Sequence, residues 1–147
     1  MPEKSPIETA LIFLSRRALT EKKLGERLSA SGFSPAEIRE TLNRLTGWGY
    51  LNDYEFGKNR VEHLLEKLKS RAFVEGDLLA NGLKMEAVQE LMALHYPESL
   101  EIEIAQKLLR RKSHEKRQNK VWGFAFLMRS GFSENTIHRC FPEVSST

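Results

Sequence analysis

The chain has 147 residues, of which 40% are hydrophobic and 29% are charged, and its formal net charge is +3 at pH 7. No apolar run is long enough to cross a bilayer, and the single cysteine, Cys140, excludes an internal disulfide and a cysteine-based metal cage. We therefore expect a soluble protein of a reducing, cytoplasmic compartment that does not associate with a membrane.

Helix signals dominate the chain, and strand signals are nearly absent. Ser5 is a capping residue followed by a proline and, three residues after the cap, by Glu8, which predicts the start of a first helix. Thr20 predicts the start of a second helix, and Gly32 predicts its end. A third helix is expected over 34–47, because the same capping pattern recurs there. These three helices form one predicted unit.

The next two stretches of the chain have the same organisation. In the second unit we expect a helix from Asn52 or Asp53 to residue 68, a short helix that ends at Gly82, and a helix that stops before Pro97. In the third unit we expect a helix that begins near Ser99, one that ends at Gly131, and one that stops before Pro142. The sequence thus predicts an all-α protein of nine helices in three tandem three-helix repeats, 1–48, 49–97 and 98–147, which form an elongated, curved array.

A repeated turn supports this reading. Residues 31–38, 81–88 and 130–137 share a turn glycine, and the glycines at 32, 82 and 131 are 50 and 49 residues apart. Such a period is typical of stacked supersecondary units. Apolar residues recur at equivalent positions around each glycine: Leu28, Leu78 and Leu127; Phe33, Leu83 and Phe132; Ile38, Val88 and Ile137; Leu42, Met92 and Phe141. Stacked helical units commonly serve as binding surfaces, which favours binding over catalysis.

The positive charge is concentrated in one segment. Residues 1–106 carry a net charge of −3, whereas residues 107–120 carry seven basic side chains against Glu115 alone. A segment of this kind favours polyanions or an acidic protein surface, although a solvated connection between helices is the alternative. The basic residues are Lys107, Arg110, Arg111, Lys112, Lys116, Arg117 and Lys120.

A smaller cluster lies between the first two predicted helices. It consists of Arg16, Arg17, Lys22 and Lys23, and the two arginines could instead satisfy carbonyl groups at the end of the first helix. The aromatic residues Trp48, Tyr50, Tyr54 and Trp122 could stack on nucleic-acid bases, but we expect them to pack at hinges between units.

No catalytic constellation is present in the sequence. The four histidines, at 63, 95, 114 and 138, have no metal-ligand spacing, and no glycine loop is suited to hold a phosphate. Cys140 falls at a core-facing position, and Glu101 and Glu103 lie near a helix start, where they complement the helix dipole. We expect no enzyme activity, no metal and no cofactor.

The helix–glycine turn–helix pattern is also the outline of a DNA-reading motif. The helix after Gly32, however, exposes Glu37 and Glu40, which would repel phosphates. A dedicated base reader is therefore disfavoured, while binding to a nucleic-acid backbone through residues 107–120 remains open.

Taken together, residues 9–142 resemble the RecX family of bacterial recombinase regulators. The residues that carry the resemblance are Leu14-Ser15-Arg16-Arg17-Ala18-Leu19-Thr20, Leu24, Leu28, Gly32-Phe33, Ile38, Leu42, Leu45, Gly49-Tyr50-Leu51-Asn52-Asp53, Phe56, Phe126-Leu127, Arg129, Gly131-Phe132-Ser133 and Ile137. The resemblance implies a curved array of three repeats that lies in the groove of the RecA filament on DNA. It also implies suppression of strand exchange, ATP hydrolysis and co-protease activity, and some family members bind DNA themselves.

The sequence departs from the family pattern in its middle unit. Where the family has a basic residue followed by Gly-Tyr-Gly-Pro, this chain has residues 71–75, Arg-Ala-Phe-Val-Glu. Asn52 replaces the usual Asp, and Gly57 replaces the usual Ala.

Three hypotheses follow. The first is a monomeric, non-enzymatic modulator of the RecA filament that acts in recombination, DNA repair and the SOS response. The second is a protein that binds single- or double-stranded DNA through phosphates, with no recombinase partner. The third is a general helical scaffold.

Overall fold

The computed structural model describes residues 4–141, which form ten helices and no strand. The helices are α1 (Pro6–Arg16), α2 (Glu21–Ala30), α3 (Pro35–Gly47), α4 (Asp53–Glu66), α5 (Arg71–Ala80), α6 (Met85–His95), α7 (Glu98–Arg110), α8 (His114–Gln118), α9 (Lys120–Arg129) and α10 (Glu134–Cys140). The predicted all-α class is confirmed. Pro142, the expected stop of the last helix, lies outside the described residues.

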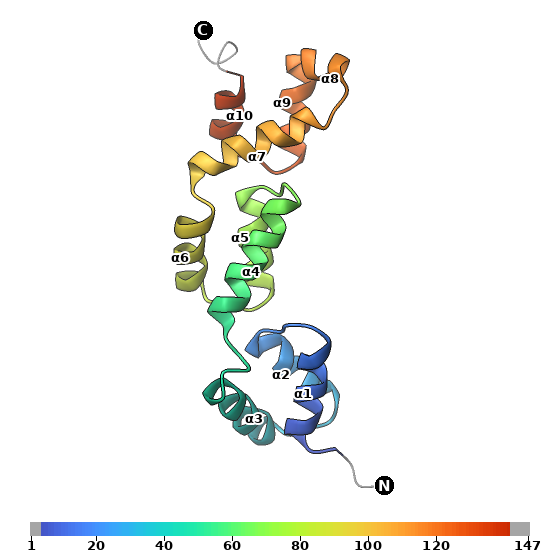
Figure 1. Cartoon of the computed structure of the whole chain (residues 1–147), viewed down its shortest axis with the longest axis vertical. Coiled ribbons are helices and arrows are strands. Elements are labelled where there is room, and N and C mark those ends of the chain that lie inside the picture. The colour runs from blue at the N-terminus through green and yellow to red at the C-terminus, as the bar shows by residue number, and fades with distance from the viewer. Residues whose placement is uncertain (1–3, 142–147) are drawn as a thin grey trace.

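The helices are arranged as three groups along one long axis (Figure 1). Helices α1–α3 pack on one another at the N-terminal end, and α4–α6 pack on one another in the middle. At the other end α10 packs on α7 and α9, while α8 lies beside α9. The molecule is therefore elongated, as a stack of helical units should be.

Local capping explains where the helices begin. The hydroxyl groups of Ser5 and Thr20 accept hydrogen bonds from the backbone N–H three residues later, as the sequence predicts. Ser34 and Glu37 form a complete capping box, with N–O distances of 3.2 and 3.0 Å. Asn52, one of the two residues considered at that position, caps α4. These contacts satisfy amide groups that a helix cannot pair internally.

The three repeated turns have one geometry. Gly32, Gly82 and Gly131 have φ values of 96°, 99° and 90°. In each turn the amide of the residue after the glycine donates to the carbonyl of the leucine five residues before it, at 3.1 or 3.2 Å. This is the Schellman arrangement, in which the glycine takes the left-handed conformation and an apolar residue follows it. The leucines concerned, Leu28, Leu78 and Leu127, are completely buried.

Among residues 4–141, the buried apolar side chains form two clusters rather than three. One lies within α1–α3 and the loop that follows them, around Leu24, Leu28 and Leu45. The other is continuous from Val61 to Ile137 and so includes the second and third groups. The repeat boundaries at 48/49 and 97/98 stay a prediction, because the second boundary separates groups that share a core.

The structure corrects the expected number of helices. A tenth helix, α8, lies in the connection between α7 and α9, where the sequence indicates at most a solvated link. Its five residues contain no apolar side chain, so no hydrophobic period marks it. Ser113 caps it by accepting from the amide of Lys116 at 3.4 Å.

The structure also corrects the role of the aromatic residues. Trp48 and Tyr50 are 54% and 63% exposed, and Tyr54 is exposed as well, so they do not pack at a hinge. The guanidinium of Arg44 lies 5.0 Å from the centre of the Trp48 ring, and Tyr50 meets that ring edge-on. The buried residue of this loop is Leu51, whereas Trp48 is the C-terminal cap of α3.

Among the described residues, no helix is long and apolar enough to cross a membrane.

Candidate functional site

The basic segment predicted over 107–120 forms one end of the molecule. Lys107 and Arg110 lie in the last turn of α7, and Arg111 is its C-terminal cap. Lys116 and Arg117 belong to α8, which Figure 1 shows beside α9 at the end of the array. All five are exposed, and so is Lys120 at the start of α9; only Lys112 is half-buried.

Two aromatic rings of α9 hold this segment in place. Trp122 and Phe126 are one helical turn apart, and their rings stack with centres 5.1 Å apart and an angle of 7°. The ammonium of Lys116 lies 5.3 Å from the Trp122 ring centre, and that of Lys112 lies 4.7 Å from the Phe126 ring centre. Such cation–π contacts fix a charge on a surface without neutralising it. Trp122 therefore packs within its own repeat, and not between units as expected.

The basic residues from Lys107 to Arg117 have no acidic partner within the described part of the chain. Within residues 4–141, the ion pairs are Lys23 with Glu26 and Arg60 with Asp77, and neither involves the segment. Because Lys107, Arg110, Arg111 and the α8 side chains face solvent, their field extends outward to a distance set by the salt concentration.

The smaller cluster has mixed surroundings. Arg16 and Arg17 are exposed at the end of α1, and within the described residues their side chains donate to no carbonyl there. Lys23 pairs with Glu26 at 3.8 Å. Lys22 packs its stem against the turn at Gly82, so it belongs to the junction between the first two groups.

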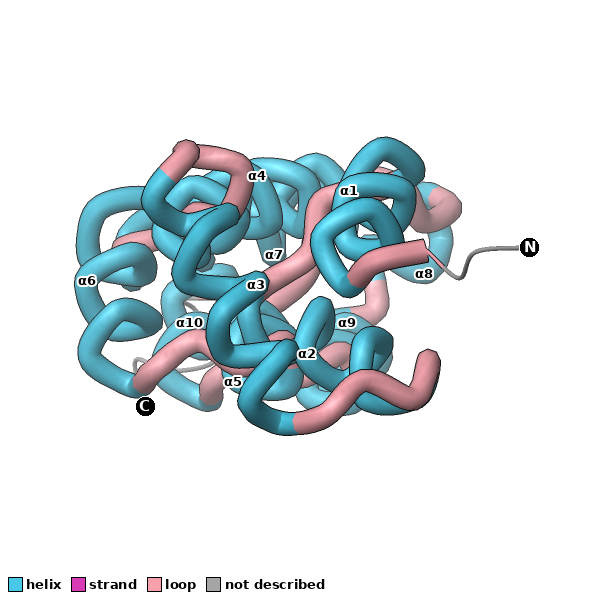
Figure 2. The backbone as a smooth tube through the Cα atoms, turned by 90° about the horizontal axis from the view of Figure 1, so that it is seen from below, coloured by secondary structure: helices cyan, strands magenta, loops and turns pink. Residues whose placement is uncertain are grey.

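The structure does not bring the two basic clusters together. The end of α1 lies at the junction of the first and second groups, where Arg17 lines a cleft with residues of α4, whereas α8 lies at the far end of the third group (Figure 1). The view along that axis, however, shows α1 and α8 on the same side of the molecule (Figure 2). A single elongated partner could therefore face both clusters.

The middle group carries a similar arrangement that sequence reasoning missed. Phe73 precedes Trp122 by 49 residues, which is the repeat period, and the ammonium of Lys69 lies 4.8 Å from the Phe73 ring centre. Lys67 and Lys69 are exposed in the connection from α4 to α5. The sequence does indicate this arrangement, because basic residues occur in the connection between the first and second helices of all three repeats.

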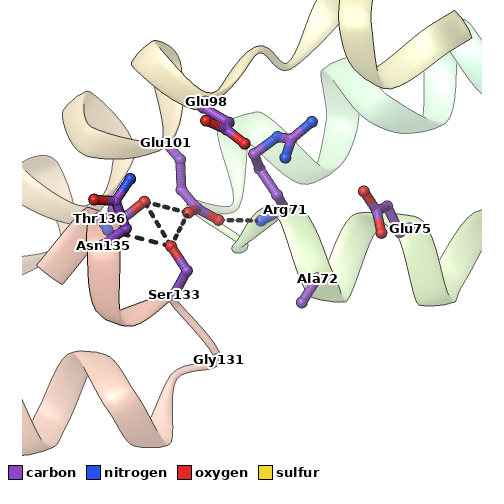
Figure 3. A pocket seen from close by; sticks show the side chains of 9 residues that line it. All are labelled: Arg71, Ala72, Glu75, Glu98, Glu101, Gly131, Ser133, Asn135 and Thr136. Carbon is purple, nitrogen blue, oxygen red and sulfur yellow. Dashed lines mark hydrogen bonds between the residues drawn. The ribbon is translucent and has the colours of Figure 1, made fainter. Parts of the chain in front are cut away.

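The junction between the second and third groups is built around Glu101, which the sequence places only at a helix start. Its side chain is buried, with 3% exposure, and one carboxyl oxygen accepts from the backbone amide of Arg71 at 2.7 Å. The other accepts from the hydroxyl groups of Thr136 at 2.5 Å and Ser133 at 3.3 Å. Figure 3 shows these side chains meeting from α5, α7 and α10. Glu101 thus joins three helices from two groups.

These residues line a cleft of about 370 Å³. Glu75 and Glu98 also line it (Figure 3). The Nε of Arg71 donates to the carbonyl of Tyr96 at 2.7 Å. Burial, followed by the charge of Glu101, raises the pKa of Tyr96, whose hydroxyl donates to the carbonyl of Lys69 at 2.8 Å. Most polar groups of the cleft are therefore hydrogen-bonded to one another and stabilise the junction between the second and third groups.

The junction between the first and second groups also has a carboxyl group that accepts from the first amide of a helix. Asp53 accepts from the backbone amide of Glu21 at 2.9 Å, and Glu21 begins α2 as Arg71 begins α5. The Thr20 hydroxyl donates to the carbonyl of Asn81 in the following repeat. Burial raises the pKa of Asp53, while the hydrogen bond from Glu21 acts in the opposite direction.

The remaining candidate side chains are not brought together. His63 and His114 are exposed, His95 and His138 are half-buried, and no group of three or more metal-binding side chains occurs among residues 4–141. Cys140 packs against the core, and burial raises the pKa of its thiol to about 11. Its interpretation as a small core residue agrees with this environment.

Comparison with known proteins gives one consistent result. The family model described as "RecX, first three-helix domain" matches residues 7–45. Proteins named "Regulatory protein RecX" match at 31% identity over 88% of this chain in Caldanaerobacter subterraneus, and at 28% identity over 97% of this chain in Syntrophotalea carbinolica. The first match spans 66% of its protein and the second 97%. A Xanthomonas campestris protein of the same name matches at 30% identity, over 62% of this chain and 56% of its own length.

Solved structures agree on the fold. The crystal structure of RecX from Lactobacillus salivarius superposes with a TM-score of 0.80, at 21% identity, over 97% of this chain and 96% of the other. A second structure of a regulatory protein RecX superposes with a TM-score of 0.75 over 94% of this chain and 70% of the other. The family model, the relatives along most of the chain and the shared fold lead to one conclusion. The chain belongs to the RecX family.

Proposed function

We propose that this protein binds the filament of the RecA recombinase and inhibits its ATP hydrolysis, strand exchange and co-protease activity. It acts as a regulator of recombination and DNA repair, without catalysing a reaction of its own, as a monomer in the cytoplasm. Family membership and the name of the relatives, regulatory protein RecX, support this proposal.

The observation that carries the proposal is the exposed basic segment at the end of the array. Arg110 and Arg111 have no acidic partner within residues 4–141, and Lys112 and Lys116 are held on the rings of Phe126 and Trp122. Fixed, uncompensated cations attract an acidic protein surface or a phosphate backbone and lose less side-chain entropy on binding than mobile ones.

The shape supports an extended partner. Helix α1, which ends at Arg16, lies on the same side of the long axis as α8, and the connection from α4 to α5, which contains Lys67 and Lys69, belongs to the middle group. A filament offers a surface long enough to meet several such points at once, and several weak contacts on one rigid body add up to tight binding.

The test is DNA-dependent ATP hydrolysis by the cognate RecA, titrated with this protein. We expect Arg110→Glu with Arg111→Glu to raise the half-inhibitory concentration by about tenfold or more, because it reverses two uncompensated charges. The control is Arg39→Glu with Lys84→Glu, which changes the net charge equally at two exposed positions outside the segment, in α3 and at the N-cap of α6. Equal inhibition by the wild type and the 110/111 variant, with unchanged helical content, would remove the segment from the mechanism.

A second candidate function is direct binding of single- or double-stranded DNA through phosphates, and the same exposed basic segment favours it. It predicts that labelled DNA binds in the absence of RecA, with an affinity that falls steeply with salt. Inhibition of RecA well below the concentration that coats DNA would support the filament proposal. Inhibition only where the DNA is coated would support the second candidate, and neither activity would leave a general scaffold.

A further inference from the structure

The outer face of α9 carries an apolar stripe, of which only Phe124 packs against the core. The stripe consists of Val121 and the residues three, four and seven positions after it, which are Phe124, Ala125 and Met128. Residues at this spacing lie on one side of a helix. Val121 is 82% exposed and Met128 is 48% exposed. These side chains line a groove of about 410 Å³, which Lys120 and His138 of α10 complete.

The other repeats show that the fold does not require this stripe. The equivalent residues, found by the glycine spacing, are Ala72, Glu75, Gly76 and Leu79 in α5 and Lys22, Gly25, Glu26 and Ser29 in α2. The same helix face is thus polar in the first repeat, mixed in the second and apolar in the third. A terminal repeat normally turns a polar face outward, so an apolar one indicates a binding surface.

The floor of the groove is formed by packed ring side chains. Phe124 is half-buried, and its ring meets that of His138 edge-on with centres 5.1 Å apart. Val121 and Met128 stand at the two ends of this floor and are open to solvent. A floor of this kind accepts apolar side chains spaced along one face of a helix.

Basic side chains lie beside the groove. Lys120 lines it, and the exposed Arg129 and Arg139 directly follow the lining residues Met128 and His138 in the chain. Glu134 is the acidic residue of α10. Charge complementarity therefore selects an acidic partner for an apolar groove.

We propose that the α9–α10 groove binds an acidic amphipathic helix of a partner protein. Apolar side chains of that helix, spaced by three or four residues, occupy the floor between Val121 and Met128, and its flanking carboxylates face Arg129 and Arg139. This contact is distinct from the charge attraction of the 107–120 segment, because it depends on apolar burial.

Other occupants fit less well. A nucleic acid needs flat exposed rings for its bases, whereas the open ends of this groove are aliphatic. In a second copy of this chain, α6 exposes Met85 and Leu94 beside glutamates. These two residues are nine positions apart, about two and a half turns, and so lie on opposite sides of the helix instead of forming one stripe.

The experiment uses fluorescein-labelled helical peptides with leucines at three- and four-residue spacing, flanked by glutamate, glutamine or lysine. Fluorescence anisotropy should give the tightest binding for the glutamate peptide and the weakest for the lysine peptide. Met128→Glu, at an exposed position, should weaken binding of the glutamate peptide by about tenfold or more, and Met128→Leu should retain it. Leu94→Glu, also at an exposed position but on α6, is the matched control and should have no effect.

Several results would overturn the proposal. They are absence of peptide binding, equal binding of the three peptides, and peptide affinity that Met128→Glu leaves unchanged in a variant of normal helical content. If the wild-type protein self-associates as its concentration rises, and both Met128→Glu and Leu94→Glu abolish this self-association, the occupant is a second copy of this chain. Loss of single-stranded DNA binding in Met128→Glu, with peptide binding unaffected, would identify a nucleic acid.

Discussion

The buried carboxyl group of Glu101 accepts a hydrogen bond from the first backbone amide of α5, that of Arg71, at 2.7 Å. The contact joins the first helix of the third repeat to the second helix of the second repeat. Asp53 makes the equivalent contact with Glu21, one repeat earlier. Each junction thus uses a carboxyl group from the next repeat to satisfy an amide at a helix start, where the helix dipole also favours it.

Removal of the Glu101 side chain should loosen the second junction. Glu101→Ala leaves the Arg71 amide and the Thr136 hydroxyl without their buried acceptor, which we expect to cost about 2–4 kcal/mol in the free energy of unfolding. Chemical denaturation measures this loss. Glu103→Ala, at an exposed position of the same helix, is the control and should change stability by less than about 0.5 kcal/mol.

The turn glycines should differ in their tolerance of a side chain. At Gly82 an added Cβ would lie 2.5 Å from the Cβ of Lys22, whereas at Gly32 no atom lies within 4 Å. Both glycines have positive φ, so alanine costs about 1–2 kcal/mol at either position. We expect Gly82→Ala to cost a further 1–3 kcal/mol, roughly, because the repeats must move apart.

Thermal or urea unfolding of the two variants tests this difference. Equal destabilisation would mean that the turn of the second repeat does not press against α2, and the described contact with Lys22 would then be wrong.

The Trp122 ring should matter for the basic segment. Trp122→Ala removes the support of Lys116 and the stacking partner of Phe126. We expect faster amide hydrogen exchange in 112–118 and weaker inhibition of RecA, by about three- to tenfold. Trp48→Ala removes a similar cation–π contact at the other end of the molecule and should leave both readouts unchanged.

The Cys140 thiol should react slowly while the protein is folded. Burial and, to a lesser degree, Glu101 raise its pKa from 9.0 to about 11. Since only the thiolate reacts, modification by a disulfide reagent at pH 8 should be about 100-fold slower than in denaturant. The rate should rise about tenfold per pH unit toward pH 11.

The same pKa shift links stability to alkaline pH. The folded thiol holds its proton more tightly than the unfolded thiol, so its contribution is fully present below about pH 9. That contribution should fall as the pH rises from 9 toward 11. A Cys140→Ser variant with an unchanged alkaline unfolding profile would show that another group controls this range.

Much of the candidate site could be predicted from the sequence because its signals are local. Residues 107–120 are visibly basic, and residues 31–38, 81–88 and 130–137 repeat one turn. The exposure of Arg110 and Arg111 follows from their place at a helix end. The cation–π contacts on Trp122 and the apolar groove beside it could not be predicted, because they depend on the short helix α8 and on how α9 packs with α10.

The sequence by itself determined the helices other than α8, the caps of α1 to α4 and the Schellman turns. These features depend on hydrogen bonds between residues at most six positions apart, as between Ser34 and Glu37 or between Leu28 and Phe33. Only the tertiary structure decided that Glu101 turns inward to Arg71, 30 residues away, and that Gly82 presses on Lys22. Those contacts arise from the angle at which one repeat docks on the next, which no local pattern encodes.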